Sequence, residues 1–186
     1  MTNSKSKGSK NERKIAKLFQ DWTGYDFART PQSGGLHWKT KNTVGDIVCT
    51  DEIHSRRFPF TVECKFHSEV DFSYLIDSTI GKSSNKLINF WYQALEEANT
   101  VGKIPLLFVR RNMMKADTHF IGLPSILFYS LILELEISHP ELGTLEYIDT
   151  KGNKVVFLNS EDFFKWDYKK IYRIAKRLTK DGKQTG

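Results

Sequence analysis

Two carboxylates and a lysine in one short stretch of this chain have the types and spacing that phosphate chemistry requires. Asp46 follows a glycine and opens the apolar run Ile47-Val48-Cys49, and Glu63 and Lys65 stand on either side of Cys64 in the next apolar run. Because side chains alternate between the two faces of a strand, Glu63 and Lys65 point the same way, about 7 Å apart. If the two runs pair as neighbouring strands, Asp46 and Glu63 can share one hard cation beside the lysine.

Such a cation would suit the hydrolysis of a phosphodiester. Mg²⁺ prefers oxygen ligands and keeps several waters, so two carboxylates and one backbone carbonyl, that of Cys64, are enough to hold it, and Mn²⁺ is an expected substitute. The ion neutralises a phosphate oxygen, lowers the pKa of a bound water and stabilises the leaving oxygen, while Lys65 orients the water or steadies the developing charge. A Glu-x-Lys pattern alone is more often a solvent-facing ion pair, and Asp46 alone is usually a turn residue. Their combination favours a catalytic site.

Glu12 and Gln93 are candidates for assisting this chemistry. Glu12 stands three residues after Ser9, so it either completes a capping box or, on the buried stripe of its helix, helps to hold the metal or its water. Gln93 lies off the apolar stripe of a later helix, where it could contact the active-site water or a phosphate. A solvated helix face is the alternative interpretation for that side of the helix.

Five further residues are candidate contacts to DNA phosphates. Ser33 and Gly34 belong to a glycine-rich turn whose amides could bind a phosphate, and Arg29 precedes that turn. Lys82 lies in the loop before the later helix and Lys86 begins that helix. Any surface loop can carry such residues, so each one alone is a weak signal.

The charge distribution favours a polyanionic partner. The net charge is +6 and the sequence pI is about 9.2. From Lys165 to the C-terminus there are eight basic and two acidic residues, whereas 131–149 holds five acidic residues and neither Lys nor Arg. The final helix therefore has a basic side, which either contacts the DNA backbone or only keeps the protein in solution.

Periodicity predicts an α/β fold. Helices are expected from Ser9 to Gly24, over 86–99 and 126–135, and after the cap residue Asp167. Strands are expected over 25–30, 46–50, 60–66, 104–109 and 118–121, and a hairpin over 145–158. The first 110 residues thus follow the order αβββαβ. We expect a flexible basic tail over 1–8, a core over 9–112 with a mixed sheet between helices, and a C-terminal α+β extension over 113–186 that packs on the core.

With Asp46 and Glu63-Cys64-Lys65 in this order, the chain resembles the PD-(D/E)XK nuclease superfamily. Within that superfamily it is most similar to archaeal and phage Holliday-junction resolvases and related phage endonucleases. The resemblance covers about residues 8–112 and includes the helix start GSKNER, the stretch RTPQSGG from Arg29, and Gln93. It implies a restriction-endonuclease-like fold, Mg²⁺-dependent cleavage of branched or duplex DNA, and a homodimer.

Three features qualify this resemblance. Gly45 stands where the motif has proline, the stretch between Lys65 and the helix of Gln93 is long for a minimal resolvase, and 113–186 has no recognised counterpart. The substrate is therefore open: a restriction, repair or packaging-type nuclease is the close alternative to a resolvase. A non-catalytic DNA-binding module on the same fold is a second alternative.

Other classes of protein are disfavoured. Gly81-Lys82-Ser83 resembles the end of a P-loop, but no apolar strand precedes it, so we expect no nucleotide cofactor. The five histidines show no zinc spacing with the two cysteines and are expected at the surface or in loops. The polar start of the chain and the absence of a long apolar run predict a cytoplasmic protein without a membrane span, in the host cytoplasm if it is viral.

Overall fold

The computed structural model describes residues 4–30, 44–68, 70–75, 86–115, 117–136, 143–149 and 152–181. Within them, seven strands form one sheet in the order β1-β2-β3-β4-β5-β7-β6. Their bounds are β1 Phe27–Arg29, β2 Ile47–Cys49, β3 Phe60–Phe66, β4 Ile104–Arg110, β5 Phe120–Pro124, β6 Thr144–Ile148 and β7 Lys154–Asn159. The helices are α1 Ser4–Thr23, η1 Phe72–Leu75 (a 3-10 turn), α2 Lys86–Val101, α3 Ser125–Glu134, α4 Ser160–Lys165 and α5 Tyr168–Asp181.

The sheet is mixed, as the sequence predicted. β3 and β4 run parallel in a continuous register from Phe60↔Ile104 to Phe66↔Arg110, and every other neighbouring pair is antiparallel. A parallel pair needs a long crossover, and α2 lies within the one that joins β3 to β4. The αβββαβ order of the first half and the α/β class are therefore confirmed. β5, β7 and β6, from the C-terminal half, continue the same sheet.

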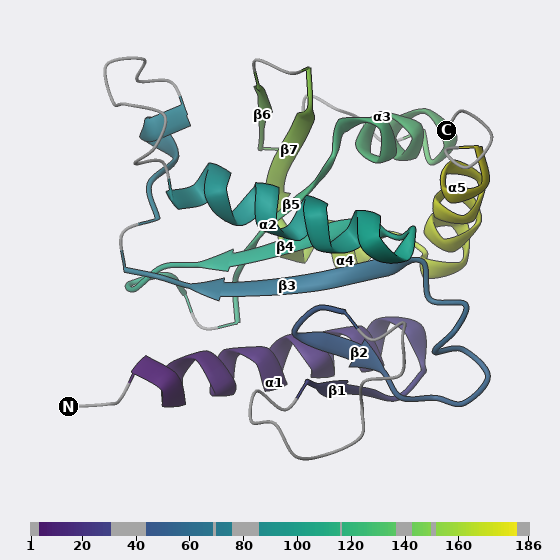
Figure 1. The fold of residues 1–186 in the computed structure, drawn as a ribbon, viewed down its shortest axis with the longest axis horizontal. Helices are drawn as coiled ribbons and strands as arrows, with labels where there is room; N and C mark the ends of the chain where they lie inside the picture. The colour runs from purple at the N-terminus through teal and green to yellow at the C-terminus, as the bar shows by residue number, and fades with distance from the viewer. Residues whose placement is uncertain are drawn as a thin grey trace.

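Alternate side chains of the central strands divide the core into two parts. Leu106 and Phe108 lie on the face that α1, α3, α4 and α5 cover, whereas Leu107 and Val109 lie on the opposite face beneath α2. Figure 1 shows α1 and α2 on opposite sides of β3 and β4. The parallel strands are covered on both faces, as is usual for such strands.

α1 carries the predicted apolar stripe, with Ile15 and Phe19 fully buried. The Phe19 ring lies 5.3–5.8 Å from four phenylalanine rings, those of Phe27, Phe58, Phe108 and Phe164. The helix begins at Ser4, however, so the start predicted at Ser9 is wrong. A capping-box pattern shows only that a helix can start there, and no proline prevents the preceding residues from continuing it.

The C-terminal half follows the predicted elements with two differences. The strand expected over 118–121 is β5, Phe120–Pro124, and Pro124 is also the N-cap of α3, because its ψ of 137° is extended. The short helix α4 was not predicted; Asn159 caps it by accepting a hydrogen bond from the Glu161 N–H at 2.9 Å. Asp167 caps α5 as predicted, accepting from the Lys170 N–H at 2.9 Å.

One histidine differs from the sequence expectation. His119 is fully buried, where its Nε2 lies 2.8 Å from Oδ1 of the buried Asn11. Burial lowers the pKa of His119 to about 4, so the ring is neutral and joins α1 to the start of β5. Of the helices that the structure describes, none has the length and apolar character needed to cross a membrane.

Candidate active site

β2 pairs with only a short part of the edge of β3. β3 pairs with β4 along its whole length, but its register with β2 is the single pair Ile47↔Val62. At that point the Asp46 N–H donates to the Val62 carbonyl at 2.8 Å. Beyond Val62, this edge of β3 pairs with no strand in the part of the chain that the structure describes, and the side chain of Asp46 lies beside it.

Gly45 allows this close approach. Its φ is +98°, in a region that residues with a side chain rarely adopt. A Cβ at this position would lie 2.8 Å from the carbonyl oxygen of Val62 and 3.0 Å from its nitrogen. The glycine that stands in the proline position of the motif thus holds the chain against β3 and fixes the position of Asp46.

The side chain of Asp46 supplies a hydrogen-bond acceptor to the backbone of β3 beyond the pair with β2. Its Oδ2 accepts a hydrogen bond from the Cys64 N–H at 2.9 Å. Burial raises the pKa of Asp46, the Cys64 hydrogen bond opposes this, and the negative charge of Glu12 raises the pKa further. The Asp46 carboxylate is therefore partly buried and accepts a hydrogen bond from Cys64, the residue that follows Glu63 in β3.

Glu63 and Lys65 lie on one face of β3, as strand alternation predicted. Lys65 Nζ lies 2.6 Å from Glu63 Oε1, and the two side chains are 23% and 8% exposed. The ammonium group also lies 5.4 Å from the centre of the Phe90 ring on α2, a cation–π distance. The lysine therefore has little freedom to move away from the carboxylate.

Glu63 and Asp46 influence each other electrostatically. The pKa of Glu63 is raised to about 7, first by burial and second by the charge of Asp46, although the Lys65 hydrogen bond lowers it. A carboxylate whose pKa is raised by a neighbouring carboxylate is in a position that favours a cation, because the cation relieves the repulsion. At neutral pH the Glu63 carboxyl is therefore partly protonated.

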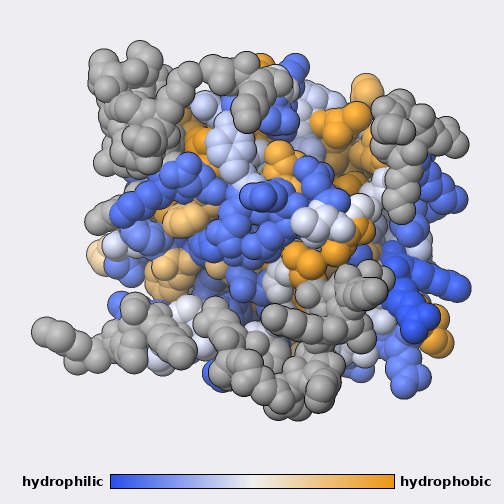
Figure 2. All heavy atoms as spheres, viewed as in Figure 1, coloured by the Kyte–Doolittle hydropathy of each residue, from blue (hydrophilic) through white to orange (hydrophobic). Residues whose placement is uncertain are grey.

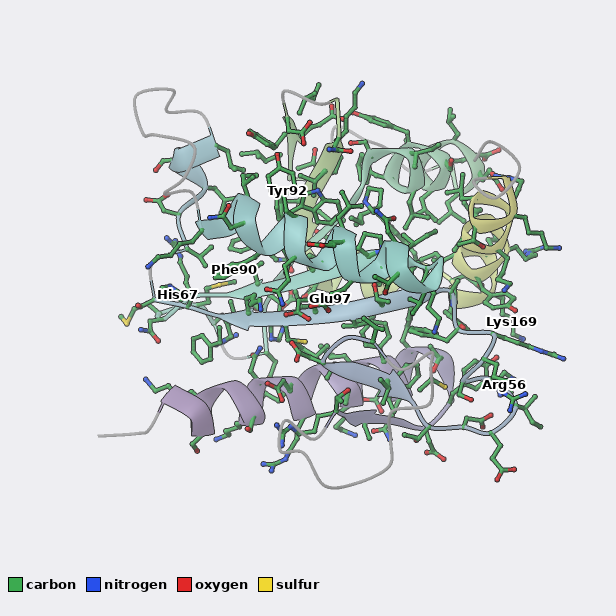
Figure 3. All side chains as sticks on the ribbon, in the orientation of Figure 1. Arg56, His67, Phe90, Tyr92, Glu97 and Lys169 are labelled. Carbon is green, nitrogen blue, oxygen red and sulfur yellow. The ribbon has the colours of Figure 1, made fainter. Side chains whose placement is uncertain are left out.

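α2 contributes Gln93 and a residue that the sequence did not suggest, Glu97. Gln93 Nε2 lies 3.4 Å from Glu63 Oε1 and 2.9 Å from Glu97 Oε1, so the amide connects the two carboxylates. The charge of Glu97 also raises the pKa of Asp46 and of Glu63. Figure 3 shows Glu97 over the middle of β3, near Phe90. Its position one helical turn after Gln93 is the signal that could have indicated it.

Glu12 and Arg29 form an ion pair beside Asp46. Arg29 Nε donates to Glu12 Oε2 at 2.7 Å, and the side chains are 25% and 8% exposed. Since α1 begins at Ser4, Glu12 does not serve as the third residue of a capping box at Ser9. The structure places it with Arg29 and in electrostatic contact with Asp46.

Of the remaining predicted DNA contacts, only Lys86 belongs to the described residues, and it is not part of this cluster. Lys86 is exposed at the first residue of α2, two helical turns before Gln93, which is about 10 Å along the helix axis. Ser33, Gly34 and Lys82 lie outside the described residues.

The donor set fits a hard divalent cation that keeps several of its waters. Among the residues that the structure describes, no group of three or more His, Cys, Asp and Glu side chains could hold a metal ion. Asp46 Oδ1 and Glu63 Oε2 accept no hydrogen bond from that same part of the chain. Two free carboxylate oxygens leave the other coordination positions to water and substrate, which is how Mg²⁺ is commonly bound.

The comparisons with known proteins agree with this geometry. Residues 3–173 match the model of a family described as "Phage putative PDDEXK endonuclease". The match extends far beyond residue 112, where the resemblance recognised in the sequence ends. Searches of curated proteins and of solved structures give no match. Nucleases of this superfamily generally use divalent metal ions. The chain belongs to this family of phage PD-(D/E)XK endonucleases.

Proposed function

We propose that this protein is a Mg²⁺-dependent endonuclease that hydrolyses phosphodiester bonds of DNA at the open edge of β3. The observation that carries the proposal is the convergence of Asp46 and Glu63, both with raised pKa values, beside Lys65. A solvated surface ion pair would not raise the pKa of its carboxylate to about 7.

Each residue has a role in this proposal. Asp46 and Glu63 would hold Mg²⁺, with the Cys64 carbonyl as a further ligand; the bound ion supplies charge neutralisation and an acidified water. Lys65, held between Glu63 and the Phe90 ring, orients the attacking water and stabilises the charge that develops on the phosphate. Gln93 holds the Glu63 carboxylate in place from α2.

Glu12 and Arg29 act at the side of the site that faces α1. Glu12 adds negative charge beside Asp46, which raises the pKa of that carboxyl and favours a cation there. Arg29, which is 25% exposed, presents its guanidinium to a phosphate while it pairs with Glu12. Arginine binds carboxylate and phosphate groups through the same planar set of donors, so one side chain can serve both.

For the substrate, we propose branched DNA of the Holliday-junction type, cut by a homodimer that presents two such sites. The resemblance to resolvases and the basic character of the chain support this choice. A restriction, repair or packaging-type nuclease would use the same site on linear duplex DNA.

A cleavage assay tests the proposal. Four-way junction and linear duplex DNA are incubated with the protein in Mg²⁺ or in EDTA, and Asp46→Ala and Lys65→Ala are compared with the exposed pair variants Asp21→Ala and Lys17→Ala. We expect cutting by wild type and by both controls in Mg²⁺ only, and none by the two site variants.

The outcomes distinguish the alternatives. Preferential cutting of the junction supports a resolvase, whereas equal or better cutting of linear DNA replaces it with the alternative nuclease classes. If wild type and all variants bind DNA equally and none cuts in Mg²⁺ or Mn²⁺, the protein is a DNA-binding module and the proposed activity is refuted.

A further inference from the structure

A basic surface lies on the outer face of α5, away from the candidate active site. The helix buries Tyr168, Ile171, Ile174 and Ala175 in the core, where it packs against α3. Its opposite face is exposed and carries Lys169, Lys170, Arg173, Arg177 and Lys180. From Lys169 to Lys180 this face is about 16 Å long.

A neighbouring turn extends this surface. Residues 51–57 carry the exposed side chains of Arg56 and Arg57. The ring of Tyr25 connects the turn to α5, because it stacks on His54 at 3.7 Å and contacts Tyr168 edge-on at 5.7 Å. Figure 3 shows Arg56 and Lys169 at the same end of the molecule, and Figure 2 shows hydrophilic residues gathered there.

Acidic neighbours offset only part of this charge. Arg177 pairs with Glu134, and Asp167, which caps α5, lies close enough to Lys169 and Lys170 for their charges to lower its pKa. Arg173 and Lys180 form no ion pair with any residue in the described part of the chain. A surplus of positive charge therefore remains along the helix.

The placement of two of these charges is unfavourable for the helix itself. Lys169 and Lys170 lie in the first turn of α5, which has no acidic residue, at the positive end of the helix dipole. Helix stability does not explain this arrangement, whereas an anionic partner would benefit from it.

The basic surface and the active site lie at different places along β3. The turn 51–57 immediately precedes the start of β3, where the Phe58 N–H donates to the His54 carbonyl. Lys65 is five residues after Phe60, which is about 17 Å along the strand. In Figure 3, His67, which follows β3, lies at the opposite end of the molecule from Arg56 and Lys169.

We propose that the exposed face of α5 and the turn 51–57 bind the backbone of duplex DNA outside the segment that is cut. Duplex DNA fits because it presents a phosphate about every 3.4 Å per strand, so the α5 stripe spans about five phosphates of one strand. The separation of about 17 Å corresponds to roughly five base pairs between the cut and this contact. The inference deepens the proposed function and rests on it for the choice of DNA.

The test measures DNA binding without cleavage. Equilibrium binding of the full chain to fluorescent duplexes of about 10 and about 30 base pairs is followed by anisotropy in EDTA over a range of salt concentrations. The α5 variant carries Lys169→Gln and Arg173→Gln, and the turn variant carries Arg56→Gln and Arg57→Gln. The matched control, Lys17→Gln with Lys154→Gln, removes the same charge from exposed positions elsewhere, and circular dichroism verifies that each variant is folded.

We expect wild type and control to bind the longer duplex more tightly than the shorter one. On the longer duplex, the α5 variant should lose affinity by roughly 10- to 60-fold near 0.1 M salt, and its log–log salt slope should fall by about 2. The turn variant should shift in the same direction.

Equal salt slopes and equal affinities for wild type, α5 variant and control would overturn the inference and leave a solvated helix face. An equal loss in the control would also overturn it, because net charge would then be the cause. Since binding in EDTA does not require cleavage, these outcomes are separate from a failure of the proposed catalytic activity.

Discussion

Replacing Glu63 by glutamine should stabilise the metal-free protein at alkaline pH while it destroys the proposed site. The pKa of Glu63 is raised from its ordinary 4.5 to about 7 by burial and by Asp46. The folded state therefore binds this proton more tightly than the unfolded state does. The resulting stability is fully present below about pH 4.5 and is lost as the pH rises through about 7.

The magnitude follows from the shift. A difference of about 2.5 pKa units corresponds to about 3 kcal/mol of lost stability once Glu63 is ionised, of which about 2 to 3 kcal/mol should be lost between about pH 5 and about pH 8. Glu63→Gln removes this dependence, and the Lys65 ion pair, which forms only when Glu63 is ionised, is already included in the pKa of about 7. The change in ΔΔG between the two pH values thus isolates the carboxylate.

Urea unfolding of wild type and Glu63→Gln at about pH 5 and about pH 8, without divalent metal, measures this difference. Relative to wild type, the variant should gain about 2 to 3 kcal/mol on going to the higher pH. Mg²⁺ should then stabilise wild type, by about 2.7 kcal/mol at a hundred times its Kd, and leave the variant nearly unchanged. A pH-independent ΔΔG, or equal stabilisation of both proteins by Mg²⁺, would refute the assignment of Glu63 to a strained carboxylate pair.

Three further substitutions probe the neighbouring residues. Lys65→Met should reduce single-turnover cleavage about 10²- to 10³-fold with unchanged affinity for DNA in EDTA, and a weakened affinity would instead show a binding role. Arg29→Met leaves the buried Glu12 without its ion-pair partner and should lower the urea unfolding free energy by about 3 kcal/mol, whereas no change would show that Glu12 is solvated. Gly45→Ala introduces a Cβ 2.8 Å from a β3 carbonyl at a positive φ, so it should cost about 1–3 kcal/mol in urea unfolding and reduce cleavage by displacing Asp46; wild-type values would contradict the close approach.

The features of this fold that the sequence predicted are those set by local periodicity. The 60–66 strand was predicted with the bounds that the structure has, and Glu63 and Lys65 share a face because alternation needs no knowledge of the rest of the fold. The helix of Gln93 was predicted within two residues of its end, because its apolar stripe and the following glycine are local signals.

The features that the sequence left open depend on contacts between distant segments. Glu97 enters the site because α2 crosses over β3; its spacing from Gln93 places both on one side of the helix but does not show that this side faces β3. Whether a possible cap residue starts a helix also depends on the rest of the fold. Asn159 caps α4, whereas α1 starts before the capping-box pattern at Ser9. His119 is buried because Asn11 on α1 supplies a partner for one ring nitrogen, a pairing across 108 positions of the chain.

The most direct test of the central claim is single-turnover cleavage of DNA in Mg²⁺ by wild type and by Asp46→Asn. Asparagine keeps the size of the side chain and an acceptor for the Cys64 N–H, but it removes the charge that a cation requires. The account predicts cutting by wild type, none by the folded variant, and unchanged DNA binding by the variant in EDTA. Cleavage by Asp46→Asn at the wild-type rate would contradict it.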